Sequence, residues 1–214
     1  CTFVFVNGHV PARNFSPHSI RLGMIREPFR RLQSAFYYLC HGASAINSQG
    51  QKVIKYDWDT QWRALLQQYP DFTSFLKDET IAKRALSLNR GKEHFFPLAY
   101  WLCDAKHRPV VDLVIRQEHF ADDVDRLFAL LGIDLPNKDE PRINAGRIKP
   151  PKLSAVEKTL MQKYYPHDSA VYDTLATENQ HNAQWEKGSA KLMQLVDALP
   201  RYKLKSQTTP IHTS

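Results

Sequence analysis

Residues 19–39 read Ser-Ile-Arg-Leu-Gly-Met-Ile-Arg-Glu-Pro-Phe-Arg-Arg-Leu-Gln-Ser-Ala-Phe-Tyr-Tyr-Leu and join a strand candidate directly to a helix. The run from Ser19 to Ile25 mixes apolar and polar residues and is a candidate for a short strand. Pro28 fits the first position of a helix, where its missing N–H costs no hydrogen bond. Apolar side chains then recur at helical spacing and predict one buried face: Phe29, Leu32, Phe36 and Leu39.

A second strand–helix unit lies in the middle of the chain. Residues 110–115 are nearly all apolar, as in a strand buried on both faces. Residues 120–131 have an amphipathic pattern that predicts a helix ending at Gly132. Because strands and helices alternate in this order, we expect an α/β fold with a mainly parallel central sheet flanked by helices.

The secondary structure of the remaining segments is predicted from shorter sequence patterns. Residues 2–6 are β-branched and aromatic and predict a strand, whereas residues 42–57 are rich in Gly, Ser, Asn and Gln and predict a long loop. Ser154 and Glu157 have the spacing of a capping box at the start of a helix. Helices are expected at 57–66, 71–77, 154–164 and 168–175.

The length of 214 residues fits one domain with an appendage. We expect the domain at residues 1–176, and a peripheral helix with a flexible basic tail at 177–214. The hydrophobic content of 43% is enough for a core, and no apolar run approaches the roughly 18 residues that cross a bilayer. The three cysteines exclude a disulfide-dense secreted scaffold.

The charge balance favours an anionic partner, because Lys and Arg exceed Asp and Glu by 7. Arg26 ends the first strand candidate immediately before a helix N-terminus, where backbone N–H groups and the helix dipole attract anions. Ser34 follows Arg30 by one helical turn, and a hydroxyl beside guanidinium groups suits a phosphate. The alternative is an ordinary amphipathic helix with a solvated basic face.

The pattern Arg26-Glu27-Pro28, then Arg31-Leu32 and Ser34-Ala35, resembles the 3′-phosphate-binding motif of sulfotransferases that use 3′-phosphoadenosine 5′-phosphosulfate (PAPS). It is most similar to carbohydrate sulfotransferases of the heparan 2-O and chondroitin 4-O type. The resemblance implies a three-layer, P-loop-like sulfotransferase fold in which Arg26 and Ser34 bind the 3′-phosphate of PAPS. It also implies in-line transfer of a sulfuryl group to a hydroxyl of an acceptor, in this family a carbohydrate, without a metal.

Further segments resemble the same family in the same order, over roughly residues 5–176. Asn7-Gly8-His9 is similar to the His-Gly-His stretch of uronyl 2-O-sulfotransferases, which implies that His9 is the general base. Histidine suits this role because its usual pKa is about 6.5. His94-Phe95-Phe96-Pro97 resembles a His-x-x-Pro segment, and His94 is expected either to face the acceptor or to cap a turn before Pro97. Arg147 closes a segment that resembles a late Asn-x-Ser/Gly motif and is assigned to the nucleotide, with a solvated charge on a loop as the alternative.

Two departures from the family pattern bear on function. Asn7 stands where the family has a histidine, which leaves the glycan specificity open. The family's 5′-phosphosulfate loop, Pro-Lys-Thr-Gly/Ala-x-Thr-Ser, does not occur in these residues, and we expect it upstream of Cys1 in a longer enzyme. Two alternatives stay open: a catalytically inactive nucleotide- or glycan-binding relative, and a P-loop-type nucleotide kinase, whose Gly-x-x-x-x-Gly-Lys-Ser/Thr motif is also missing here.

The expected partners are therefore PAPS and an acceptor glycan or another hydroxyl substrate. No metal is expected, because the histidines and cysteines lack zinc-ligand spacing. No nucleic acid is expected, because the basic residues are scattered along the chain, and no membrane contact is expected from this chain itself. Bacterial relatives are cytoplasmic, and animal relatives lie in the Golgi lumen with a membrane anchor upstream. The few cysteines and one poor glycosylation sequon, Asn14 before Pro17, favour the cytoplasmic case.

Overall fold

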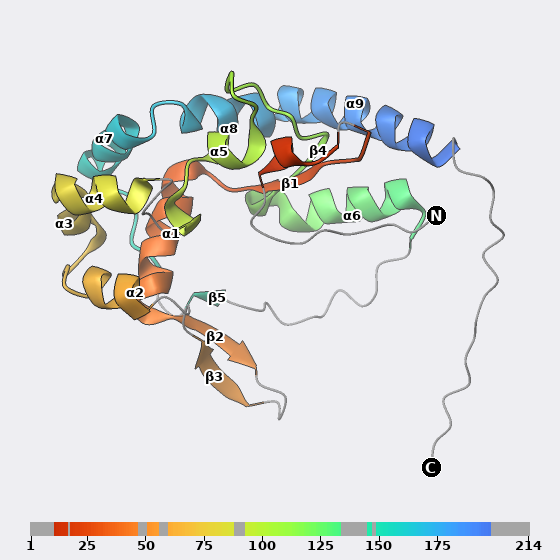
Figure 1. The fold of residues 1–214 in the computed structure, drawn as a ribbon. Coiled ribbons are helices and arrows are strands. Elements are labelled where there is room, and N and C mark those ends of the chain that lie inside the picture. Colours follow the sequence, from red (N-terminus) through yellow and green to blue (C-terminus); the bar gives the residue numbers. More distant parts are fainter. Residues whose placement is uncertain are drawn as a thin grey trace, which may run out of the picture.

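The computed structural model describes residues 11–16, 18–46, 51–55, 60–87, 93–133, 145–146 and 149–197. These residues form a helix-rich α/β structure with a small parallel sheet (Figure 1). Strands β1 (Leu22–Ile25) and β4 (Leu113–Arg116) pair in parallel, with Leu22 opposite Leu113 and Ile25 opposite Arg116. The expected parallel pairing of these two segments is confirmed.

A second sheet is antiparallel and has the strand order β3–β2–β5. Its strands are β2 (Ala43–Ile46), β3 (Lys52–Lys55) and β5 (Ala145–Gly146). The prediction of a continuous loop at residues 42–57 is therefore wrong. Strands of four residues interrupted by small and polar side chains leave no clear alternation of apolar and polar positions.

The helices account for most of the described chain. The first group follows β1 and the β2–β3 hairpin: α1 (Pro28–His41), α2 (Thr60–Leu66), α3 (Phe72–Lys77) and α4 (Glu79–Leu86). The second group lies around and after β4: α5 (Leu98–Leu102), α6 (Phe120–Leu131), α7 (Ala155–Tyr164), α8 (Asp168–Ala176) and α9 (Glu178–Asp197). Short 3-10 turns are η1 (Ala12–Asn14), η2 (Glu93–Phe95) and η3 (Gln117–His119).

Local sequence signals explain where the best-predicted helices begin and end. The Glu27 carboxylate accepts a hydrogen bond from the Arg30 N–H at 2.7 Å, and Pro28 occupies the first turn of α1. The expected capping box is confirmed at the start of α7. Gly132 ends α6 with a φ of 64°, a left-handed conformation that favours glycine.

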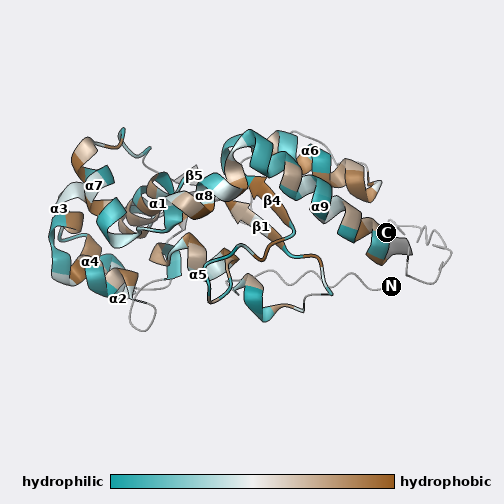
Figure 2. Cartoon of the chain, turned by 90° about the horizontal axis from the view of Figure 1, so that it is seen from above, coloured by the Kyte–Doolittle hydropathy of each residue, from teal (hydrophilic) through white to brown (hydrophobic). Residues whose placement is uncertain are grey.

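Two hydrophobic clusters hold these elements together. One cluster packs α1 against α2, α3, α4 and α7, and its largest fully buried side chains are Phe36, Phe72, Phe75 and Phe95. The other joins β1 and β4 to α5 and α8 through residues such as Ile25, Val114, Leu102 and Val171. Figure 2 shows both hydrophilic and hydrophobic colours along single helices, as expected of helices with one buried face.

Helix α9 packs against β4, so that the parallel pair lies between α9 and α6 (Figure 1). His181 and Trp185 on α9 are fully buried, and the Trp185 indole N–H donates to the Val114 carbonyl at 2.9 Å. The division of the chain after residue 176 stays a prediction, but the inner face of this C-terminal helix belongs to the core. Among the described helices, none is both long and apolar enough to span a bilayer.

Candidate functional site

The candidate site lies at the carboxyl ends of β1 and β4. Because the two strands are parallel and in register, they end side by side at Ile25 and Arg116. Arg26 and Glu27 then lead into α1, while η3 leads from β4 into α6. In open α/β sheets, ligands bind at this edge, where the backbone N–H groups of helix N-termini face the ligand.

Arg26 offers a charge with no fixed partner. Its side chain is partly buried, yet among the described residues it makes no hydrogen bond or ion pair. Burial lowers the pKa of Arg26, the nearby Glu118 carboxylate raises it, and the cationic Arg30 lowers it again. Desolvation and the neighbouring Arg30 favour binding of an anion by this guanidinium, and the carboxylates of Glu118 and Glu27 offset part of that gain.

Glu118 connects the two strand ends. One of its carboxylate oxygens accepts a hydrogen bond from the Glu27 N–H at 2.9 Å, and the other accepts one from the Tyr172 hydroxyl at 3.4 Å. Burial, followed by the charge of Glu118, raises the pKa of Tyr172 to about 12, so this hydroxyl stays protonated and can donate. The start of α1, and Arg26 before it, is thereby tied to η3 and α8.

Ser34 lies on the second turn of α1, four residues after Arg30. Neighbours at this spacing share one face of a helix. Among the described residues, neither the Ser34 hydroxyl nor the Arg30 guanidinium makes a hydrogen bond or ion pair. The face of α1 that follows Arg26 therefore carries a hydroxyl and a guanidinium that are free to contact a ligand.

His94 reaches α1 through its backbone and its ring. The partly buried Arg31 guanidinium donates to the carbonyls of His94 at 2.9 Å and Phe96 at 2.7 Å, and lies 3.7 Å from the Asp168 carboxylate. The His94 ring packs edge-on against Tyr38, with centroids 5.6 Å apart. Since Ser34 is three residues after Arg31 and four before Tyr38, His94 lies along the face of α1 that carries Ser34.

The structure thus gathers three of the five candidate residues, Arg26, Ser34 and His94, on or beside α1 and the strand end before it. His9 and Arg147 lie outside the described residues. The sequence reading of Arg31 as mainly structural fits its buried contacts with backbone carbonyls.

Two supporting residues were given no contact by the sequence reasoning, although Asp168 belongs to a segment that resembles the family's Tyr-x-x-Asp motif. Asp168 is buried and accepts hydrogen bonds from the N–H groups of Leu98 and Ala99, which fixes the start of α5 after His94. Tyr172 follows Asp168 by one helical turn and reaches Glu118. The available signal was the i, i+4 spacing of a carboxylate and a phenol within a predicted helix, which by itself indicates no particular contact.

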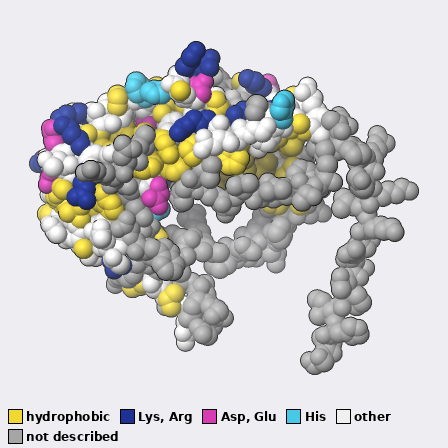
Figure 3. All heavy atoms as spheres, viewed as in Figure 1, with side chains coloured by type: hydrophobic (Ala, Val, Ile, Leu, Met, Phe, Trp, Pro, Cys, Tyr) yellow, Lys and Arg dark blue, Asp and Glu magenta, His cyan; other side chains and the backbone are white. Residues whose placement is uncertain are grey.

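The chemistry of this site is that of an oxyanion site. It combines two guanidinium groups and a hydroxyl beside the start of α1 with the carboxylates of Glu27 and Glu118, and the described residues contain no cluster of side chains that could ligate a metal. In Figure 3 the coloured Lys and Arg side chains are spread over the visible face and form no continuous stripe.

Comparison with known proteins gives one match. A family model described as "Sulfotransferase family" matches residues 5–199, which include α1 and every other element of the candidate site. No curated protein and no solved structure matches the chain.

Proposed function

The chain belongs to the sulfotransferase family, and from this premise we propose that it transfers a sulfuryl group from PAPS to a hydroxyl of a carbohydrate acceptor. In this proposal Arg26 and Ser34 bind the 3′-phosphate of PAPS, and Arg147 contacts the nucleotide. His94 faces the acceptor, and His9 is the general base. The proposed fold is the three-layer, P-loop-like arrangement, with the parallel pair as part of its central sheet.

One observation carries the assignment of the nucleotide site. The Arg26 guanidinium is partly buried at the carboxyl end of β1, and it lacks a hydrogen bond or ion pair among the described residues. A desolvated cation without a partner is costly, and a bound phosphate would offset that cost. The Ser34 hydroxyl adds a neutral donor that suits the same anion, whereas the Arg30 N–H in the first turn of α1 is already bonded to the Glu27 carboxylate.

PAPS, when bound, supplies the sulfuryl group and a phosphate leaving group. The chain's own residues must then hold the nucleotide, orient the acceptor hydroxyl and remove its proton. Arg26 and Ser34 would fix one end of the nucleotide, which restricts the orientations in which the sulfuryl group and the acceptor hydroxyl can meet. His9 would accept the proton from the acceptor oxygen, and a neutral imidazole near pH 7 is suited to that step.

Titration calorimetry with adenosine 3′,5′-bisphosphate tests the nucleotide site. We expect binding to the wild-type chain that is much weaker for 5′-AMP, because only the bisphosphate carries the group that Arg26 holds. Arg26→Ala should weaken bisphosphate binding by about tenfold or more, since a charge-assisted hydrogen bond contributes about 1.5–3 kcal/mol. Binding that ignores the 3′-phosphate, or that survives loss of Arg26, would contradict the assignment.

A second measurement separates binding from catalysis. Release of adenosine 3′,5′-bisphosphate from PAPS is followed with a panel of glycan acceptors, using wild type and His9→Ala. We expect His9→Ala to bind the bisphosphate as wild type does and to lose turnover. Because the 5′-phosphosulfate loop is expected upstream of Cys1, the assay uses the longer enzyme; tight bisphosphate binding by that enzyme without turnover on any acceptor would instead identify a catalytically inactive, nucleotide-binding relative.

A further inference from the structure

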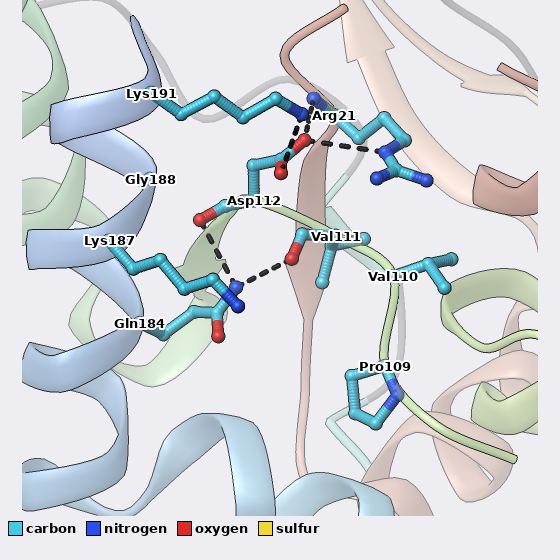
Figure 4. A pocket seen from close by; sticks show the side chains of 9 residues that line it. All are labelled: Arg21, Pro109, Val110, Val111, Asp112, Gln184, Lys187, Gly188 and Lys191. Carbon is cyan, nitrogen blue, oxygen red and sulfur yellow. Dashed lines mark hydrogen bonds and ion pairs between the residues drawn. The ribbon is translucent and has the colours of Figure 1, made fainter. Parts of the chain in front are cut away.

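A second charged pocket lies at the opposite end of the parallel pair from the candidate site. It has a volume of about 230 Å³ and is formed where Arg21 precedes β1, residues 109–112 precede β4, and α9 crosses both. Figure 4 shows the α9 side chains extending toward this segment. Each strand has four residues at about 3.3 Å per residue, so the pocket is roughly 13 Å from the strand ends that carry Arg26.

The charges of this pocket are unbalanced. Asp112 is its carboxylate, and it is shared by two cations: Arg21 Nε lies 3.3 Å from Asp112 Oδ2, and Lys191 Nζ lies 2.8 Å from Asp112 Oδ1. Lys187 adds a third cation, which makes no hydrogen bond or ion pair among the described residues. The lining therefore carries two more positive than negative charges.

The Arg21 guanidinium also has hydrogen-bond donors without an acceptor among the described residues. Its side chain bonds Asp112 through Nε, and its two terminal nitrogens have no acceptor among the described residues. A guanidinium with a free planar edge can bind two oxygens of one sulfate, phosphate or carboxylate group. Pro109, Val110 and Val111 supply apolar walls beside these donors.

The way α9 packs sets the position of these lysines. An ideal Cβ at Gly188 would lie 2.2 Å from the Asp112 carbonyl oxygen, so only glycine allows the helix to approach this closely. Gln184 secures the same approach, because its side-chain amide donates to the carbonyls of Val111 and Asp112. Lys187 and Lys191 are spaced four apart on this helix and so share one face beside the pocket.

We propose that this pocket binds an oxyanion, a sulfate or phosphate group, at a site separate from the nucleotide site. Its volume is below the roughly 300–1,000 Å³ of pockets that enclose drug-sized ligands, which suits a single anionic group with a short apolar body. The group is either a free inorganic anion or the sulfate of a glycan chain. The inference does not depend on the proposed transfer reaction, because it rests on other residues.

An NMR titration of the ¹⁵N-labelled chain tests the proposal, with sodium sulfate and a sulfated disaccharide as probes at constant ionic strength. We expect saturable shifts of the Gly188 and Asp112 amide signals. Lys187→Gln should weaken binding about tenfold, because it removes one free cation. The matched variant Lys158→Gln, an exposed lysine on α7 without a partner among the described residues, should bind as wild type does.

Arg26→Ala separates this pocket from the nucleotide site, since the shifts at Gly188 should survive in that variant. Saturation by inorganic sulfate alone identifies a small-anion site. Tighter saturation by the disaccharide, with sulfate as competitor, identifies a glycan site. Shifts that do not saturate, that cluster away from α9, or that are equally strong in Lys187→Gln would overturn the proposal.

Discussion

Replacing Gly188 by alanine would force α9 away from the segment that precedes β4. The added methyl carbon would lie 2.2 Å from the Asp112 carbonyl oxygen and 2.6 Å from Leu113 Cδ2, whereas ordinary contact begins near 3.4 Å. The nearest obstacle is backbone, so relief requires the helix to shift by about 1 Å. Overpacking of this kind costs about 1–3 kcal/mol.

Two further effects of the substitution oppose each other. Alanine favours a helix interior over glycine by about 1 kcal/mol. A shifted α9 loses alignment for the Trp185 bond to Val114 and the Lys191 pair with Asp112, and each hydrogen bond contributes about 1 kcal/mol. We therefore expect a net loss of about 2 kcal/mol and a fall in Tm of about 4–8 °C.

Urea unfolding followed by tryptophan fluorescence measures this loss, because Trp185 is buried in the native chain. Ala190→Gly is the matched control, since Ala190 is exposed on the same helix and reports helix propensity without a clash. If propensity alone governed α9, Gly188→Ala would be stabilising by about as much as Ala190→Gly is destabilising. A Gly188→Ala chain as stable as wild type would refute the packing argument.

Three other predictions follow from buried or capping groups. Burial lowers the pKa of His181, so below about pH 6.5 the unfolded chain binds a proton that the folded chain does not, and the free energy of unfolding should fall as the pH drops. Urea titrations at several pH values measure this dependence, and His181→Phe should make the free energy of unfolding depend less on pH. Ser154→Ala removes the cap of α7 and should lower the free energy of unfolding by about 1 kcal/mol, while Ser154→Asp should retain most of it. Burial raises the pKa of Cys40 to about 12 and of Cys103 to about 11, so mass spectrometry should find both thiols unmodified by iodoacetamide at pH 8 until the chain is unfolded.

The elements that the sequence predicted well are those fixed by local signals. Helix α1 has a proline at its start and a regular apolar stripe, α6 has a glycine stop, and α7 has a capping box. Each of these signals acts within a few residues, so it can be read without knowing the tertiary contacts. The same reasoning placed Arg26 at a strand end before a helix, which is where the structure has it.

The elements that escaped prediction depend on contacts between distant residues. The β2–β3 hairpin has four-residue strands, and its second partner, β5, comes about a hundred residues later. The buried face of α9 has a helical spacing that is present in the sequence: His181, Trp185, Gly188 and Leu192 recur at intervals of four, three and four. Because histidine and glycine are not apolar markers, that face does not stand out in a hydrophobic pattern.

The pairing of β1 with β4 also sets the order in which the chain can fold. Residues brought together at this pair, such as Arg21 and Asp112, are 91 positions apart. At synthesis rates of about 5–20 residues per second, β1 leaves the ribosome roughly 5–18 s before its partner strand. During that interval α1 to α4 can assemble around Phe36 and Phe75, since their contacts are closer in sequence. We therefore expect the contacts among α1 to α4 to form before the parallel pair closes, and the part of the cluster that α7 completes to form after β4 has been made.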